Sequence, residues 1–130
     1  MADQTAAVID ERICDPMKDK HHQRFPLKYG ELRDMRCGAV TDEANGIRRV
    51  RDFRPTYFTA DWTDGVLVQV TVWGPQLLDD GSDGERDLDY RWKATRDLGP
   101  VKYRELPRVV AERLMAYNAE NGFTVLPEQR

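Results

Sequence analysis

The sequence predicts an α+β domain: an antiparallel β meander of about four strands, a C-terminal helix packed on one face and a short N-terminal helix. Three observations favour this class. Residues 56–73 alternate apolar and polar side chains on either side of an Asp64-Gly65 turn signal. Residues 87–95 alternate in the same way. Residues 106–120 instead space their apolar side chains as a helix does.

Length and composition indicate one domain over residues 1–130. The chain is 40% hydrophobic and long enough to bury a core. We divide it into an N-terminal helix and irregular arm (1–34), an antiparallel sheet (35–95), a C-terminal helical region (100–122) and a tail (123–130). The charged fraction of 33% predicts an ionic surface, and the net charge of −3 argues against broad non-specific binding to nucleic acid.

The chain contains no apolar run of membrane-spanning length and no positively charged leader, so we expect a cytoplasmic protein of bacterial or phage origin. Two cysteines, Cys14 and Cys37, are too few for a disulfide framework, and we expect both to be reduced.

The N-terminal part reads as a helix followed by an arm. Residues 3–13 have a capping aspartate and an apolar stripe, which predicts a short helix. Residues 14–36 follow neither the helical nor the strand period, which favours a surface loop. Its apolar residues are expected to anchor this arm to the mixed face of the central hairpin; they are Phe25, Leu27, Tyr29 and Leu32.

Two strands are predicted before the central hairpin, at 35–41 and 47–55, joined by a turn at 43–46. In the hairpin itself, a three-residue loop at 63–65 with Gly65 left-handed makes one face almost wholly apolar. Burial therefore selects the register that pairs Trp62 with Val66, Ala60 with Val68, Phe58 with Val70 and Thr56 with Val72.

The remaining elements extend and cover this sheet. Residues 79–86 form a polar loop, and the strand at 87–95 continues the apolar face with Leu88, Tyr90, Trp92 and Ala94. The helix at 106–120 has Pro107 in its first turn and Gly122 as a left-handed stop. It is expected to pack on the valine face through Leu106, Val110, Leu114 and Tyr117. Residues 123–126 are a candidate edge strand before a frayed end.

The opposite face of the hairpin mixes large and polar side chains. It carries Pro55, Tyr57, Thr59, Asp61, Leu67, Gln69, Thr71 and Trp73. Two interpretations fit this pattern. Either another part of the chain covers the face, because exposed apolar patches are uncommon on monomers, or the face binds a partner, because aromatic residues are enriched at interfaces.

Catalytic and metal-binding patterns are weak. The spacing of Cys14, His21, His22 and Cys37 matches no zinc module. The acidic run at 79–85 is too short for a calcium loop, and the single serine, Ser82, is in no nucleophile motif. We therefore expect no catalytic residue, no metal and no cofactor, and lean against an enzyme.

Three function classes remain open. We favour a non-enzymatic protein-binding module, such as an adaptor, inhibitor or assembly subunit, acting through Tyr57, Leu67 and Trp73, with self-association through the same face as a variant. The first alternative is nucleic-acid binding through an arginine-rich strand with Arg48, Arg49, Arg51 and Arg54. The second is a small-ligand or enzymatic pocket between sheet and helix, lined by Trp62, Tyr90 and Trp92.

Overall fold

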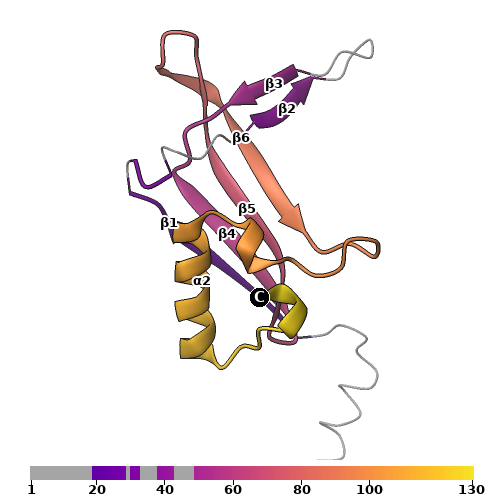
Figure 1. Ribbon diagram of the computed structural model, residues 1–130. Helices are drawn as coiled ribbons and strands as arrows, with labels where there is room; N and C mark the ends of the chain where they lie inside the picture. Colours follow the sequence, from indigo (N-terminus) through magenta and orange to yellow (C-terminus); the bar gives the residue numbers. More distant parts are fainter. Residues whose placement is uncertain (1–18, 29, 33–37, 43–48) are drawn as a thin grey trace, which may run out of the picture.

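The computed structural model describes residues 19–28, 30–32, 38–42 and 49–130 (Figure 1). Its main element is a four-stranded antiparallel sheet in the order β1-β4-β5-β6, formed by Lys20–Pro26, Tyr57–Thr63, Val66–Leu77 and Asp83–Lys93. A separate antiparallel pair consists of β2 (Gly38–Asp42) and β3 (Arg49–Asp52). The helices follow, as η2 (Tyr103–Glu105), α2 (Arg108–Asn121) and η3 (Pro127–Gln129). The antiparallel sheet with a C-terminal helix confirms the α+β class, whereas the helix expected at 3–13 lies outside the described residues.

Strand β1 corrects the prediction of an irregular arm. It forms one edge of the main sheet and pairs antiparallel with β4, with His22 opposite Asp61 and Phe25 opposite Phe58. The alternation of apolar and polar residues does not reveal this strand, because only one of its core-facing residues, Phe25, is buried and apolar. The other two are His21 and Gln23, and both bond to the hydroxyl of Tyr117 on α2.

Strands β2 and β3 also differ from the prediction. They were expected to open the main meander, but they pair with each other and form a sheet of their own. The chain joins the main sheet after Phe53, where the backbone N–H groups of Arg54 and Thr56 donate to carbonyls of β5. Pro55 lies between these two donors. It has no N–H group, but its position in the strand pairing requires no donor, so no hydrogen bond to β5 is lost.

The hairpin between β4 and β5 closes with a two-residue turn, so the predicted three-residue loop is wrong. Asp64 and Gly65 both have positive φ, 51° and 79°, as a type I′ turn requires. Trp62 therefore pairs with Leu67 and not with Val66. Aspartate is one of the few residues with a Cβ that enters the left-handed region readily, which is why Asp-Gly alone suffices.

A β-bulge beside this turn keeps Val70 and Val72 on the core side. With an uninterrupted two-residue hairpin, Gln69 would pair with Ala60 and face the core. The bulge makes Val68 an extra residue of β5, and Ala60 pairs with Val70 instead of the predicted Val68. Because one inserted residue reverses the alternation, Leu67 and Val70 are both fully buried.

The core lies between the sheet and α2 (Figure 1). Phe25 stacks on Phe58 with ring centroids 4.7 Å apart, and Val110 and Leu114 of α2 are fully buried in the same cluster. The predicted packing of the helix on the valine face is thus confirmed, and Gly122 ends the helix in the left-handed conformation.

The predicted anchors of the N-terminal arm also join this core. Phe25 and Leu32 are buried in it and Leu27 packs against it, so their assignment to the mixed face is wrong. The reason is the pairing of β1, which directs Phe25 to the same side as Phe58. Tyr29 lies outside the described residues.

Two buried polar groups tie the C-terminal part to the sheet. Asn118 accepts a hydrogen bond from the Trp62 indole at 2.9 Å and donates one to the Tyr103 hydroxyl at 2.8 Å. Gln129, fully buried, donates to the backbone carbonyls of Leu67 and Val101. The end of the chain is therefore held in place, and the prediction of a frayed tail is wrong.

Alkaline pH is expected to weaken the fold through Tyr103. Burial raises the pKa of its phenol above 10.0, and the hydrogen bond from Asn118 offsets part of that rise. Above about pH 10 the unfolded chain releases this proton while the folded chain retains it, so the free energy of unfolding falls. Urea unfolding from pH 8 to 11 should show a flatter decline in Tyr103→Phe than in the wild type, and equal slopes would contradict this assignment.

Candidate binding face

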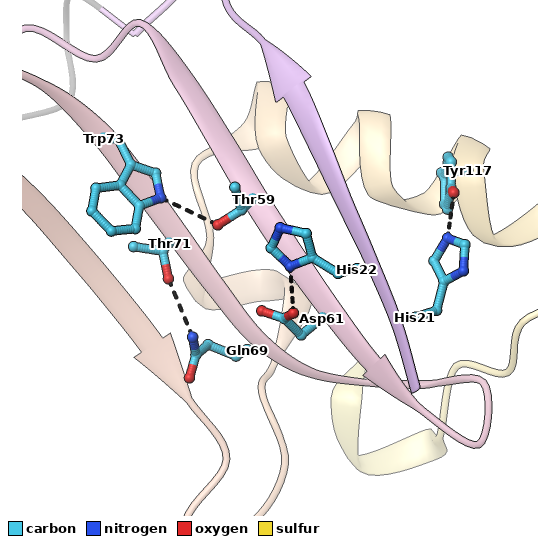
Figure 2. Close-up of polar contacts among 8 residues, drawn as sticks. All are labelled: His21, His22, Thr59, Asp61, Gln69, Thr71, Trp73 and Tyr117. Atoms are coloured by element: carbon cyan, nitrogen blue, oxygen red, sulfur yellow. Dashed lines mark hydrogen bonds and ion pairs between the residues drawn. The ribbon is translucent and has the colours of Figure 1, made fainter. Parts of the chain in front are cut away.

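The sheet face opposite the core is called here the open face. The cross-strand register places its side chains in rows, from His22 through Asp61 and Gln69 to Lys93, from Arg24 through Thr59 and Thr71 to Arg91, and then Tyr57, Trp73 and Asp89. Figure 2 shows His22, Asp61, Thr59 and Trp73 on the side of the strands away from α2. The described helices all contribute to the core on the other side, with Tyr103, Leu114 and Gln129 buried there.

An aromatic pair lies within the open face. Tyr57 and Trp73 are cross-strand partners, with nearly parallel rings and centroids 6.1 Å apart. The guanidinium of Arg24 lies over the Tyr57 ring, with its Cζ 3.9 Å from the centroid. The Trp73 indole N–H donates to Thr59 Oγ1 at 3.2 Å (Figure 2). Both rings are partly exposed, and these contacts hold them in a fixed orientation.

Cationic side chains stand at both edges of the open face. Arg24 comes from β1, and Arg91 and Lys93 come from β6. Arg91 is 3.5 Å from the carboxylate of Asp89, its neighbour on the same face, and both side chains are well exposed. At this exposure the pair is a weak restraint, so the guanidinium of Arg91 can exchange Asp89 for another carboxylate.

A groove with a volume of about 510 Å³ crosses one end of the open face. All four strands contribute to it through Lys20, His21, His22, Asp61, Trp62, Thr63, Val68, Gln69, Lys93 and Ala94. His22 Nδ1 is 2.6 Å from Asp61 Oδ1 (Figure 2). An ionised carboxylate only accepts hydrogen bonds, so Nδ1 of His22 carries the proton in this contact.

The two adjacent histidines have opposite environments. His21 faces the core side, where its Nε2 is 2.5 Å from the Tyr117 hydroxyl and its ring contacts Trp62 and Phe123. His22 is exposed on the open face. Alternation along β1 causes this divergence, so the two rings cannot bind one ion together.

The predicted protein-binding residues are only partly brought together. Tyr57 and Trp73 form the stacked pair, but Leu67 is fully buried in the core. The assignment of Leu67 to a binding face is therefore wrong, because the bulge at Val68 reverses the alternation before Gln69. Of the three predicted protein-binding residues, Tyr57 and Trp73 remain candidates.

The predicted arginine-rich strand is described only in part. Arg48 lies outside the described residues, and Arg49 and Arg51 belong to β3, whose backbone alone is described. Arg54 forms two hydrogen bonds with Asp83, and this pairing holds the pKa of the Asp83 carboxyl below its usual value. Nucleic-acid binding by these arginines stays a prediction.

The predicted pocket between sheet and helix stays a prediction, but Trp62 does not offer it an exposed ring. Trp62 is 1% exposed and bonded to Asn118, so its ring is core. Tyr90 and Trp92 contact each other on the outer strand β6. The groove lies instead across one end of the strands, with Asp61, Gln69 and Lys93 among its lining.

The acidic turn before β6 is explained by local bonds. Asp80 accepts hydrogen bonds from the backbone and hydroxyl of Ser82, which hold the pKa of its carboxyl below the usual range. Among residues 19–28, 30–32, 38–42 and 49–130, no three His, Cys, Asp or Glu side chains are arranged as metal ligands. Cys14 and Cys37 lie outside these ranges.

Comparison of the chain with protein-family models, curated proteins and solved structures gives no match. In the part of the chain that the structure describes, no helix has the length and apolar character to cross a membrane. The fold and the candidate site define a small α+β domain in which the described helices pack on one face of the main sheet.

Proposed function

We propose that the protein is a non-enzymatic binding module whose open face binds an acidic segment of another protein. The observation that carries this proposal is the stacked Tyr57–Trp73 pair, which is partly exposed, with the Arg24 guanidinium over Tyr57 and Arg91 in the adjacent cross-strand row on the other edge strand. Aromatic residues and arginine are enriched in the centres of protein interfaces and often supply most of the binding energy.

The charge at the edges supports an acidic partner. The whole chain has a net charge of −3, yet Arg24 on β1 and Arg91 on β6 put positive charge near the aromatic pair from both edge strands. A partner segment with carboxylates at its margins and an apolar or aromatic centre would match this arrangement. Such complementarity speeds association and selects among partners.

The same geometry favours a protein over single-stranded nucleic acid. Base stacking requires a free aromatic face, but Arg24 lies over the Tyr57 ring and Trp73 stacks beside it. Asp89, the cross-strand partner of Trp73 on β6, would also repel phosphates beside the aromatic pair. An acidic peptide meets less of this repulsion, because its charges are fewer and can be placed at the edges.

Replacing Tyr57 and Trp73 together with serine is expected to abolish high-affinity peptide binding. Peptides selected on the wild-type protein from a random displayed library should be enriched in Asp and Glu, and the double variant should bind them about thirtyfold more weakly or worse. Circular dichroism should show the variant folded, because both rings are partly exposed. Fluorescence anisotropy of labelled peptides measures the affinities.

The matched control is Tyr90→Ser, which removes a tyrosine that is 40% exposed on β6 from the core side of the sheet. It should leave peptide affinity within about twofold of the wild type, since surface changes outside a contact cost little. Equal binding by a folded Tyr57→Ser/Trp73→Ser variant would contradict the proposal. Enrichment of basic peptides, or tighter binding of a single-stranded oligonucleotide, would do so as well.

A further inference from the structure

The groove at the end of the open face has a charge pattern that the proposed protein interface does not explain. Lys20 and His22 come from β1 and Lys93 comes from β6, so cationic groups flank the groove from opposite edges of the sheet. Neighbouring strands are about 4.8 Å apart, which separates β1 from β6 by about 14 Å at the backbone. Three basic side chains therefore border one depression of small-molecule size.

The single carboxylate among the described residues lining the groove is already engaged. Asp61 Oδ1 accepts the Nδ1 proton of His22 at 2.6 Å. This contact occupies one oxygen of Asp61 and orients the imidazole, so that Nε2 points away from Asp61 (Figure 2). The groove therefore presents two ammonium groups and an oriented ring nitrogen, with the amide of Gln69 between them.

We propose that this groove binds the phosphate group of a phosphorylated ligand. Lysine ammonium groups bind phosphate as point charges, and the oxygens of a phosphate monoester accept several hydrogen bonds at once. Lys20 and Lys93 would neutralise the two charges from opposite sides, and His22, on taking up a second proton from solvent at Nε2, would donate it to a phosphate oxygen. The volume of about 510 Å³ leaves room for the organic part of the ligand.

The two histidines provide an internal control for the test. They are the only histidines in the chain, and they lie on opposite faces of the sheet. Titration of the full chain with inorganic phosphate, at constant ionic strength, should shift the ring resonances of His22 saturably in a ¹H–¹³C spectrum. His21 also belongs to the groove lining, but its ring is bonded to Tyr117 on the core side, so its ring resonances should shift much less than those of His22.

Substitution of the two lysines tests the charge argument. Lys20→Gln and Lys93→Gln should each weaken phosphate binding about threefold, and the double variant about tenfold, as expected for exposed charge contacts. Lys28→Gln, which removes an exposed lysine outside the groove, should leave it unchanged. Absence of a saturable His22 shift, equal movement of both histidines, or undiminished binding by the double variant would overturn the proposal.

A second comparison identifies the source of the phosphate. Methyl phosphate and a peptide containing phosphoserine are titrated in parallel against the same resonances. Similar affinities assign the groove to small phosphorylated molecules, whereas an affinity about tenfold higher for the peptide assigns it to a phosphorylated protein. Because this site does not use Tyr57 or Trp73, phosphate binding should persist in the Tyr57→Ser/Trp73→Ser variant. The phosphate site and the proposed protein interface can therefore be tested independently.

Discussion

Replacing Gly74 with alanine is expected to destabilise the domain by about 3 kcal/mol or more, because the new methyl group has no space. A Cβ at this buried position would be 1.8 Å from the carbonyl oxygen of Arg54 and 3.0 Å from the Cα of Pro55. Both atoms belong to backbone that is bonded to β5 through Arg54 N–H and Thr56 N–H. The backbone must move to admit the methyl group, and those bonds would be broken or strained.

Gly81→Ala is the matched control for this substitution. Gly81 has a φ of 85°, but a Cβ there would meet nothing within 4 Å. Its replacement should cost only the strain of a left-handed alanine, about 1 kcal/mol. Urea unfolding of both variants measures the difference. A Gly74→Ala variant that is no less stable than Gly81→Ala would show that the backbone of Arg54 and Pro55 does not lie against Gly74 as described.

The second large effect is expected for Asn118→Ala. This buried amide is 2% exposed, accepts the Trp62 indole proton and donates to the Tyr103 hydroxyl. Truncation leaves both aromatic polar groups without this partner and opens a small cavity between sheet and helix. The expected loss is about 3 kcal/mol in the free energy of unfolding, from an unsatisfied indole N–H and the lost packing.

Tyr103→Phe provides the comparison for Asn118→Ala. It removes one member of the same chain of hydrogen bonds but keeps the ring and the bond between Trp62 and Asn118, so it should cost about 1 kcal/mol. The double variant Asn118→Ala/Tyr103→Phe should be less destabilised than the sum of the two, because the hydroxyl is already unpaired after the first change. Additive losses would mean that Asn118 does not bridge Trp62 and Tyr103.

The elements that the sequence predicts correctly are those whose apolar pattern decides their packing. The helix over 106–120 was found as α2 because its stripe of Val110 and Leu114 faces the sheet and Gly122 can end it. The alternation of 87–95 likewise belongs to β6, with Leu88 buried. In both cases burial of a single face determines the structure, and burial is what periodicity measures.

The mistaken predictions come from local features that periodicity does not record. The bulge at Val68 reverses the alternation of β5 and moves Leu67 from the predicted binding face into the core. Strand β1 presents His21 and Gln23 inward, where their polarity is satisfied by Tyr117, a partner almost a hundred residues away in the chain. Neither the bulge nor the long-range contact with Tyr117 can be recognised from the periodicity of residues that are neighbours in the sequence.

The candidate site was predictable only where it depends on β4 and β5. Tyr57 and Trp73 share a face in the predicted hairpin and do so in the structure. The groove was missed because His22 comes to Asp61 through the pairing of β1. Lys93 alternates with Trp92 and Ala94 in the strand predicted at 87–95, which is a signal for the open face, but only the full strand order brings it into the same row as His22.

The most direct test of the central claim, that the open face is the binding surface, uses the three tryptophans of the chain. Their indole N–H resonances report on different places: Trp73 on the open face, Trp62 in the core and Trp92 on β6 toward the core side. Adding the tightest selected acidic peptide to ¹⁵N-labelled protein should shift the Trp73 indole and leave the other two in place. A shift of Trp62 or Trp92, with Trp73 unmoved, would contradict the claim.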